Sequence, residues 1–117
     1  MTITLDELRR DIDRVDEVLV RLLNERARCV CEVGRLKKAS GIDIYQPDRE
    51  KEVLKHVREV AHEGPLGPEA IGRLFERIID EARRLERRVV HGEMDGELKP
   101  EGLKPESLKP ESLKSEI

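Results

Sequence analysis

The sequence predicts an all-α protein in which one very long N-terminal helix and two shorter helices form a chain that pairs with a second copy of itself. Three observations lead to this fold class. Apolar residues recur at steps of three and four in three segments, which is the spacing of one helix face. Short stretches with glycine and proline separate the segments, and such residues end helices or begin new ones. The first segment is too long for the rest of its own chain to cover.

The first helix is predicted to begin at Thr4, because Thr4 and Glu7 have the spacing of a capping box. No stop signal follows before Ser40-Gly41. Arg26 takes the one position of the apolar series that is not apolar, and the series itself consists of Leu8, Ile12, Val15, Leu19, Leu22, Cys29, Val33 and Leu36. A helix of about 35 residues is about 50 Å long, whereas a globule of about 100 residues has a radius of gyration of about 13 Å. A homodimer that shares this helix is therefore expected.

The second helix is predicted to begin at Pro47, because proline is favoured at the first helical position. Asp48 and Glu50 then lie in the first turn, where the helix dipole favours negative charge. The helix is expected to run to about His62, before Gly64-Pro65 ends it.

The third helix is predicted to begin at Pro68 and to reach about Val90, before Gly92. Its apolar stripe consists of Ile71, Leu74, Phe75, Ile78, Ile79 and Ala82. Residues 1–91 are thus expected to form the helical domain. The chain after Gly92 ends in a repeat of Lys, Pro, Glu and Ser without apolar periodicity, so residues 92–117 are expected to be a disordered tail.

Composition restricts the class of partner. Charged residues make up 42% of the chain, and 23 basic and 26 acidic side chains are interspersed along most of it. This pattern gives no large field of one sign, so nucleic acid is not an expected partner. The opening MTITLDELRR lacks the features of a secretory signal and no apolar run is long enough to cross a membrane, so the protein is expected in the cytoplasm. Cys29 and Cys31 point to opposite sides of a helix and are expected to stay reduced and metal-free.

Charged residues on the apolar stripes are the candidate functional residues. Arg26 and Lys37 are eleven residues apart, so their side chains emerge on the same face about 16 Å apart. Arg9 lies about 100° around the helix and addresses a different surface, including one of a partner chain. Glu86 lies on the stripe of Phe75 in the third helix. Two interpretations remain open: a salt bridge from Glu86 to one of the cations, or a cationic pocket for a small dianion that contains one carboxyl group.

The segments LRRDIDRVDEVLVRLLNERARCVCEVGRLK, DREKEVL and RLFERIIDEARRLE, in this order and spacing, resemble the all-helical chorismate mutase family of the shikimate pathway. The resemblance covers residues 5 to about 90. It implies an intertwined homodimer with two active sites, each completed by an arginine from the long helix of the other chain. That arginine corresponds to Arg9.

The resemblance also implies roles for residues of the binding site. Arg9 and Arg26 would clamp the two carboxylates of chorismate, and Lys37 would donate to its ether oxygen. Arg49 corresponds to a supporting arginine and Glu50 to a glutamate that binds the substrate hydroxyl. Gln46 stands where the family often has aspartate and stays a possible contact.

Besides Gln46, two further positions depart from the commonest pattern of the family. Glu86 stands where many members have a glutamine that donates to the ether oxygen, and a carboxylate has no proton to donate. The resemblance therefore implies a protonated Glu86 and an activity that falls as the pH rises toward and above neutrality. Ala82 stands where a serine often binds a carboxylate, and its methyl group cannot make that bond.

The implied activity is a cofactor-free isomerisation, the pericyclic (Claisen) rearrangement of chorismate to prephenate in phenylalanine and tyrosine biosynthesis. Lys37, Glu86 and Arg26 are its expected catalytic residues. Such a reaction needs no nucleophile, metal or redox cofactor. The protein supplies confinement of the reactive conformation and donors directed at the ether oxygen as it gains negative charge.

Two alternatives remain open at this point. An isochorismate pyruvate lyase has a similarly cationic pocket on the same fold, and formation of salicylate and pyruvate from isochorismate would identify it. A non-catalytic helical dimerisation module would use its polar residues only to set register. In that module Arg26→Leu would stabilise the dimer, whereas in an enzyme it would abolish turnover with the fold intact.

Overall fold

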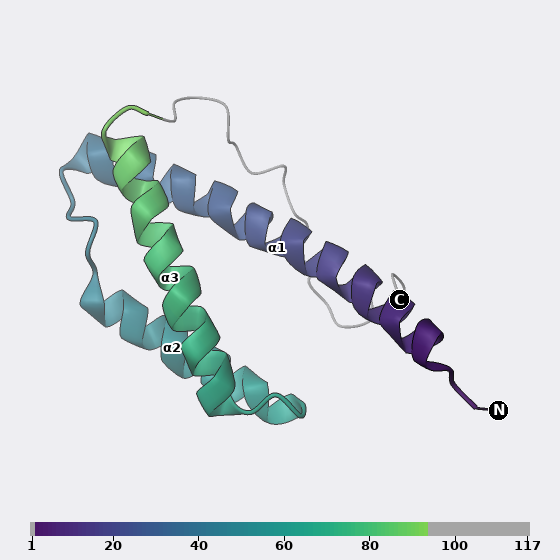
Figure 1. Cartoon of the computed structure of the whole chain (residues 1–117). Helices are drawn as coiled ribbons and strands as arrows, with labels where there is room; N and C mark the ends of the chain where they lie inside the picture. Colours follow the sequence, from purple (N-terminus) through teal and green to yellow (C-terminus); the bar gives the residue numbers. More distant parts are fainter. Residues whose placement is uncertain (1, 94–117) are drawn as a thin grey trace. The chain divides into compact units, whose positions relative to one another are not determined.

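The structure, a computed structural model, describes residues 2–93. It contains helix α1 (Leu5–Ser40), helix α2 (Pro47–Val60), the short 3-10 helix η1 (Ala61–Glu63) and helix α3 (Pro68–Val90). Figure 1 shows these elements in chain order. The all-α prediction, with three helices and a long first one, is confirmed. Apart from residues 92 and 93, the predicted tail lies outside the described residues.

The predicted start of α1 is confirmed by its capping box. The backbone N–H of Glu7 donates to the Thr4 hydroxyl oxygen at 3.1 Å, and the backbone N–H of Thr4 donates to the Glu7 carboxylate at 3.1 Å. Two amides that the helix itself cannot bond are thereby satisfied, a contribution of about 1 kcal/mol.

Glycines end the two longer helices where the sequence predicts. Gly41 has a φ of +68°, and the N–H of Ile42 after it donates back to the Lys37 carbonyl at 3.0 Å. Gly92 has a φ of +76°, and the N–H of Glu93 donates to the Arg88 carbonyl at 2.9 Å. Both ends have the bond pattern of a Schellman motif, whose left-handed residue is most easily a glycine.

The second helix is slightly shorter than predicted. Pro47 occupies a first-turn position as expected, but the α-helix ends at Val60 and the next residues tighten into η1. The predicted end near His62 therefore falls inside the 3-10 turn. Short 3-10 turns are common at helix ends, and the sequence carries no separate signal for them.

The chain divides into two compact units, and within the described residues these are 2–29 and 30–93. In residues 30–93, α2 and α3 pack side by side and run in opposite directions (Figure 1). The buried apolar residues here are few: Cys31, Ala61, Ile79 and Val89. Burial raises the pKa of the Cys31 thiol, an effect that the nearby Arg35 opposes. The thiol is therefore held neutral at physiological pH.

Residues 2–29 comprise the segment before α1 and the first part of α1, and most of their large apolar residues are exposed. The exposed large apolar residues are Ile3, Leu5, Leu8, Ile12, Val15, Leu19, Val20 and Leu23. Separately, no helix within residues 2–93 is both long enough and apolar enough to cross a membrane.

Gly34 marks the close approach of the end of α1 to α3. A Cβ atom at Gly34 would lie 3.2 Å from Val89 Cγ1 and 3.6 Å from Glu86 Cα. We expect Gly34→Val to lower the free energy of unfolding by about 1–3 kcal/mol, because its methyl groups would force these backbones apart. Chemical denaturation measures this effect. Ala39→Val, at an exposed position of the same helix, is the control, and an equal loss in both variants would contradict the packing explanation.

Candidate active site

An ion pair joins the last turn of α1 to α3. Lys37 Nζ donates to Glu86 Oε1 at 3.1 Å and to Oε2 at 3.3 Å, and also to the Ile44 carbonyl at 3.0 Å. The two side chains are only 14% and 9% exposed. Of the two interpretations that the sequence left open, the structure contains the salt bridge between Glu86 and Lys37.

This ion pair does not exclude ligand binding. A lysine ammonium group has three N–H donors, and here three oxygens accept from them. A ligand oxygen that approaches Lys37 therefore has to replace one of these acceptors. The pair is also important for stability, since the loss of one member of a buried pair typically costs about 3–5 kcal/mol. Lys37 can thus hold the fold together and still donate to a bound molecule.

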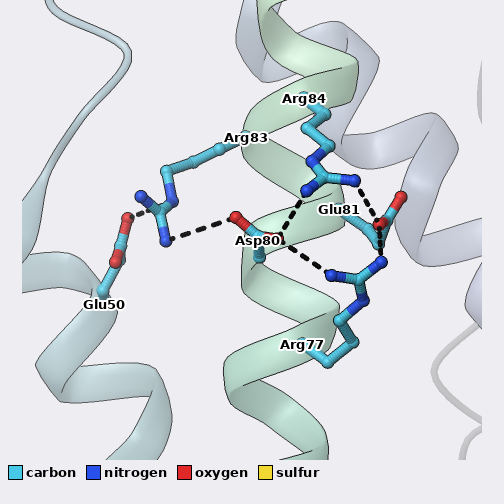
Figure 2. Close-up of polar contacts among 6 residues, drawn as sticks. All are labelled: Glu50, Arg77, Asp80, Glu81, Arg83 and Arg84. Carbon is cyan, nitrogen blue, oxygen red and sulfur yellow. Dashed lines mark hydrogen bonds and ion pairs between the residues drawn. The ribbon is translucent and has the colours of Figure 1, made fainter.

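A second charged cluster links α2 to α3 around Glu50. Arg83 Nε lies 3.2 Å from Glu50 Oε2, and Arg83 Nη2 lies 3.9 Å from Asp80 Oδ1 (Figure 2). The Arg83 guanidinium also lies over the ring of Tyr45, 5.7 Å from the ring centroid. The Arg83 and Glu50 side chains are 29% and 23% exposed, so water screens their attraction only in part. Glu50 is therefore held by a residue of the neighbouring helix.

Sequence reasoning did not identify Arg83. A usable signal was present, because Arg83 follows Ile79 by four residues and precedes Glu86 by three, so it borders the apolar stripe of α3. It was hidden among the other arginines of RIIDEARRLERR, which the helix period places at varied angles around α3.

The structure places the remaining predicted residues of α2 and α3 as follows. Gln46 precedes α2, and its side-chain Nε2 donates to the Asp43 carbonyl at 3.0 Å. Arg49 is exposed and pairs with Glu52 one turn along α2. Ala82 is half-buried, one turn before Glu86. Their roles toward a ligand remain predictions.

Arg9 and Arg26 belong to the other unit, residues 2–29, and are described there by themselves. Arg9 is exposed and Arg26 is half-buried. Their participation in a binding site also remains a prediction. Within residues 2–93, no group of three or more His, Cys, Asp and Glu side chains is placed to hold a metal ion.

Two side chains of residues 30–93 carry groups that a ligand can bind, one a donor and the other an acceptor. The ammonium group of Lys37 can donate to a ligand oxygen, and a carboxylate such as that of Glu50 can accept from a hydroxyl group. Both groups are partly buried and already held by protein partners, so their positions are defined before a ligand binds.

The comparisons with known proteins agree on one family. The sequence profile of the family described as Chorismate mutase type II matches residues 8–87. The chain is 35% identical over 88 residues to a "Bifunctional chorismate mutase/prephenate dehydratase" of Aquifex aeolicus, a match that covers 73% of this chain and 24% of the relative. The corresponding bifunctional protein of Stutzerimonas stutzeri is 43% identical over 88 residues, covering 71% of this chain and 24% of the relative.

A shorter relative matches over most of its length. The "Chorismate mutase" of Methanocaldococcus jannaschii is 27% identical over 84 residues, which covers 72% of this chain and 85% of the relative. In contrast, the match spans about a quarter of the length of the bifunctional relatives. No solved structure matches the chain.

Proposed function

The chain belongs to the chorismate mutase type II family, and on this basis we propose that it converts chorismate to prephenate in aromatic amino acid biosynthesis. The observation that carries the proposal is the family match over residues 8–87, which includes every predicted site residue. The partly buried Lys37 and Glu50, each held by a protein partner, support it, because they supply a donor and an acceptor of the required kinds.

The reaction breaks a C–O bond and forms a C–C bond within one molecule, and the protein accelerates it by binding alone. Arg26 and an Arg9 from the partner chain would clamp the two carboxylates, as arginine binds carboxylates with two parallel hydrogen bonds. Lys37 would donate to the ether oxygen, which gains negative charge in the transition state. The bound conformation would keep the reacting carbon atoms close together.

Other residues would orient the substrate. Glu50 would accept a hydrogen bond from the substrate hydroxyl group, with Arg49 and Gln46 as supporting contacts. Glu86 would donate to the ether oxygen beside Lys37 when it carries a proton, as a glutamine at this position would do through its amide. Loss of the Lys37 donor would lower kcat, whereas loss of the hydroxyl contact would mainly weaken substrate binding.

The purified chain of residues 1–117 should consume chorismate, as followed by the loss of its absorbance, with prephenate identified as the product. A folded chain that leaves chorismate unchanged at every pH between about 4.5 and 8.5 would contradict this proposal. Isochorismate is then the next substrate to assay, because a lyase on the same fold would release salicylate and pyruvate.

We further propose an intertwined homodimer in the cytoplasm. The uncovered apolar stripe of residues 2–29 supports the dimer, because a second copy of the same helix could cover it. Arg9 is exposed on this part of α1, as an arginine that enters a partner's site would be in an isolated chain. Nothing in this proposal requires nucleic acid, a membrane or a cofactor.

Complementation between two inactive variants tests the role of Arg9. Arg9→Ala and Lys37→Met should each be inactive, whereas a mixture unfolded and refolded together should regain about a quarter of wild-type turnover, because half of the dimers then contain one intact site. Sedimentation of each variant checks that dimers form. Failure to regain activity in a mixture that contains mixed dimers would place Arg9 in the site of its own chain.

A further inference from the structure

We propose that Arg83 is a positioning residue that holds the Glu50 carboxylate in place to accept a hydrogen bond from the substrate hydroxyl group. The inference rests on the function proposed above, in which Glu50 binds that hydroxyl. It adds a residue to the site that neither the sequence pattern nor the family resemblance identified.

Three groups lie around the Arg83 guanidinium, and its contacts are ion pairs and a ring contact, because the buried Nε makes no hydrogen bond within residues 2–93. Its Nε lies 3.2 Å from Glu50 Oε2, its Nη2 lies 3.9 Å from Asp80 Oδ1, and its guanidinium carbon lies 5.7 Å from the centroid of the Tyr45 ring. Asp80 contacts it from the preceding turn of α3, while Tyr45 lies in the segment that leads into α2. These contacts place the positive charge of the guanidinium beside the Glu50 carboxylate.

The geometry distinguishes Arg83 from its neighbours. Arg77 and Arg84 also contact Asp80, each at 3.3 Å, and both contact Glu81 as well (Figure 2). All of these partners lie on α3. The contact that Arg83 makes with Glu50 instead crosses to α2, as Figure 2 shows. Arg83 therefore connects Asp80 of α3 to Glu50, the predicted hydroxyl acceptor.

Glu50 needs such a partner because its side chain is flexible. A glutamate loses considerable rotamer freedom when it is fixed, and an unfixed carboxylate pays this cost when the ligand binds. Glu50 lies in the first turn of α2 and is 23% exposed, so packing alone leaves it some freedom. The attraction of Arg83 restrains this carboxylate, which has several lone-pair sites and can still accept from a ligand hydroxyl.

This role predicts a particular kinetic signature. The substrate hydroxyl group neither forms nor breaks a bond in the rearrangement, so its contact with Glu50 is equally strong in the ground state and the transition state. Loss of such uniform binding raises KM and leaves kcat nearly unchanged. We expect Arg83→Met, which keeps the apolar part of the side chain, to raise KM about tenfold.

The experiment compares steady-state kinetics of Arg83→Met, Arg83→Lys and Arg77→Met with the wild type. Arg77→Met is the matched control, because Arg77 is an exposed arginine that contacts the same Asp80 but stays on α3. It should keep wild-type kinetics. Arg83→Lys retains the charge without the fork-shaped guanidinium and should raise KM by a smaller factor. Thermal unfolding of each variant separates loss of fold from loss of binding.

A double-mutant cycle with Glu50→Ala tests whether Arg83 acts through Glu50. If it does, Arg83→Met should have no further effect in the Glu50→Ala background. An undiminished rise in KM in that background would show that Arg83 contacts the substrate itself and would overturn the positioning role. Equal kinetics of Arg83→Met and Arg77→Met would overturn it as well. A folded wild-type chain that leaves chorismate unchanged would instead overturn the proposed function, and this inference with it.

Discussion

Lys37→Met is expected to lower kcat for chorismate by about a hundredfold or more, because it removes the donor proposed for the ether oxygen. The ammonium group lies 3.0–3.3 Å from three protein oxygens, and one of these acceptors has to be replaced by the ether oxygen when the substrate binds. Steady-state kinetics should show the loss mainly in kcat. Lys38→Met removes a neighbouring exposed lysine and should leave kcat unchanged.

The same substitution also leaves the buried Glu86 carboxylate without its partner. Loss of one member of such a pair can cost about 3–5 kcal/mol of a total stability of about 5–15 kcal/mol, so the variant could lose activity simply by unfolding. The double variant Lys37→Met/Glu86→Gln separates the two effects, because a neutral amide at position 86 needs no cation. We expect it to fold and still to lack most of the wild-type kcat. Full activity in a folded double variant would contradict the role of Lys37.

The helices were predictable from sequence because their signals are local. The capping box at Thr4, Pro47 and Pro68 at helix starts, and Gly41 and Gly92 at helix ends each act within a few residues of their own position. The end of α2 was less predictable, because the change from α-helix to the 3-10 turn depends on how the chain turns toward α3.

The charged contacts were predictable only in part. Glu86 was identified because it breaks an apolar stripe, and Lys37 was one of two cations that could meet it. The sequence did not distinguish Lys37 from Arg26 as the partner of Glu86, because the helix period places both on the same face of the first helix. The contact between Arg83 and Glu50 depends on how α2 packs against α3, and no local pattern specifies that packing.

Glu86→Gln is expected to change the pH dependence of turnover. A carboxyl group can donate to the ether oxygen only when it carries a proton, so kcat of the wild type should fall as the pH rises. The amide of glutamine donates at every pH, so the variant should keep its rate from about pH 5 to 8. Rates of chorismate consumption across this range measure both profiles.

The contact between Lys37 and Glu86 competes with donation from Glu86 to the ether oxygen. Lys37 Nζ donates to both Glu86 oxygens, so a Glu86 that donates to the ether oxygen has to give up Lys37 as its partner. Glu81→Gln, at an exposed position of the same helix, controls for a general effect of removing one acid and should keep the wild-type profile. A wild-type profile that is flat over this range would mean that Glu86 works as an anion. Its function would then be to hold Lys37 in position, and the ammonium group would be the only one of the two that donates to the ether oxygen.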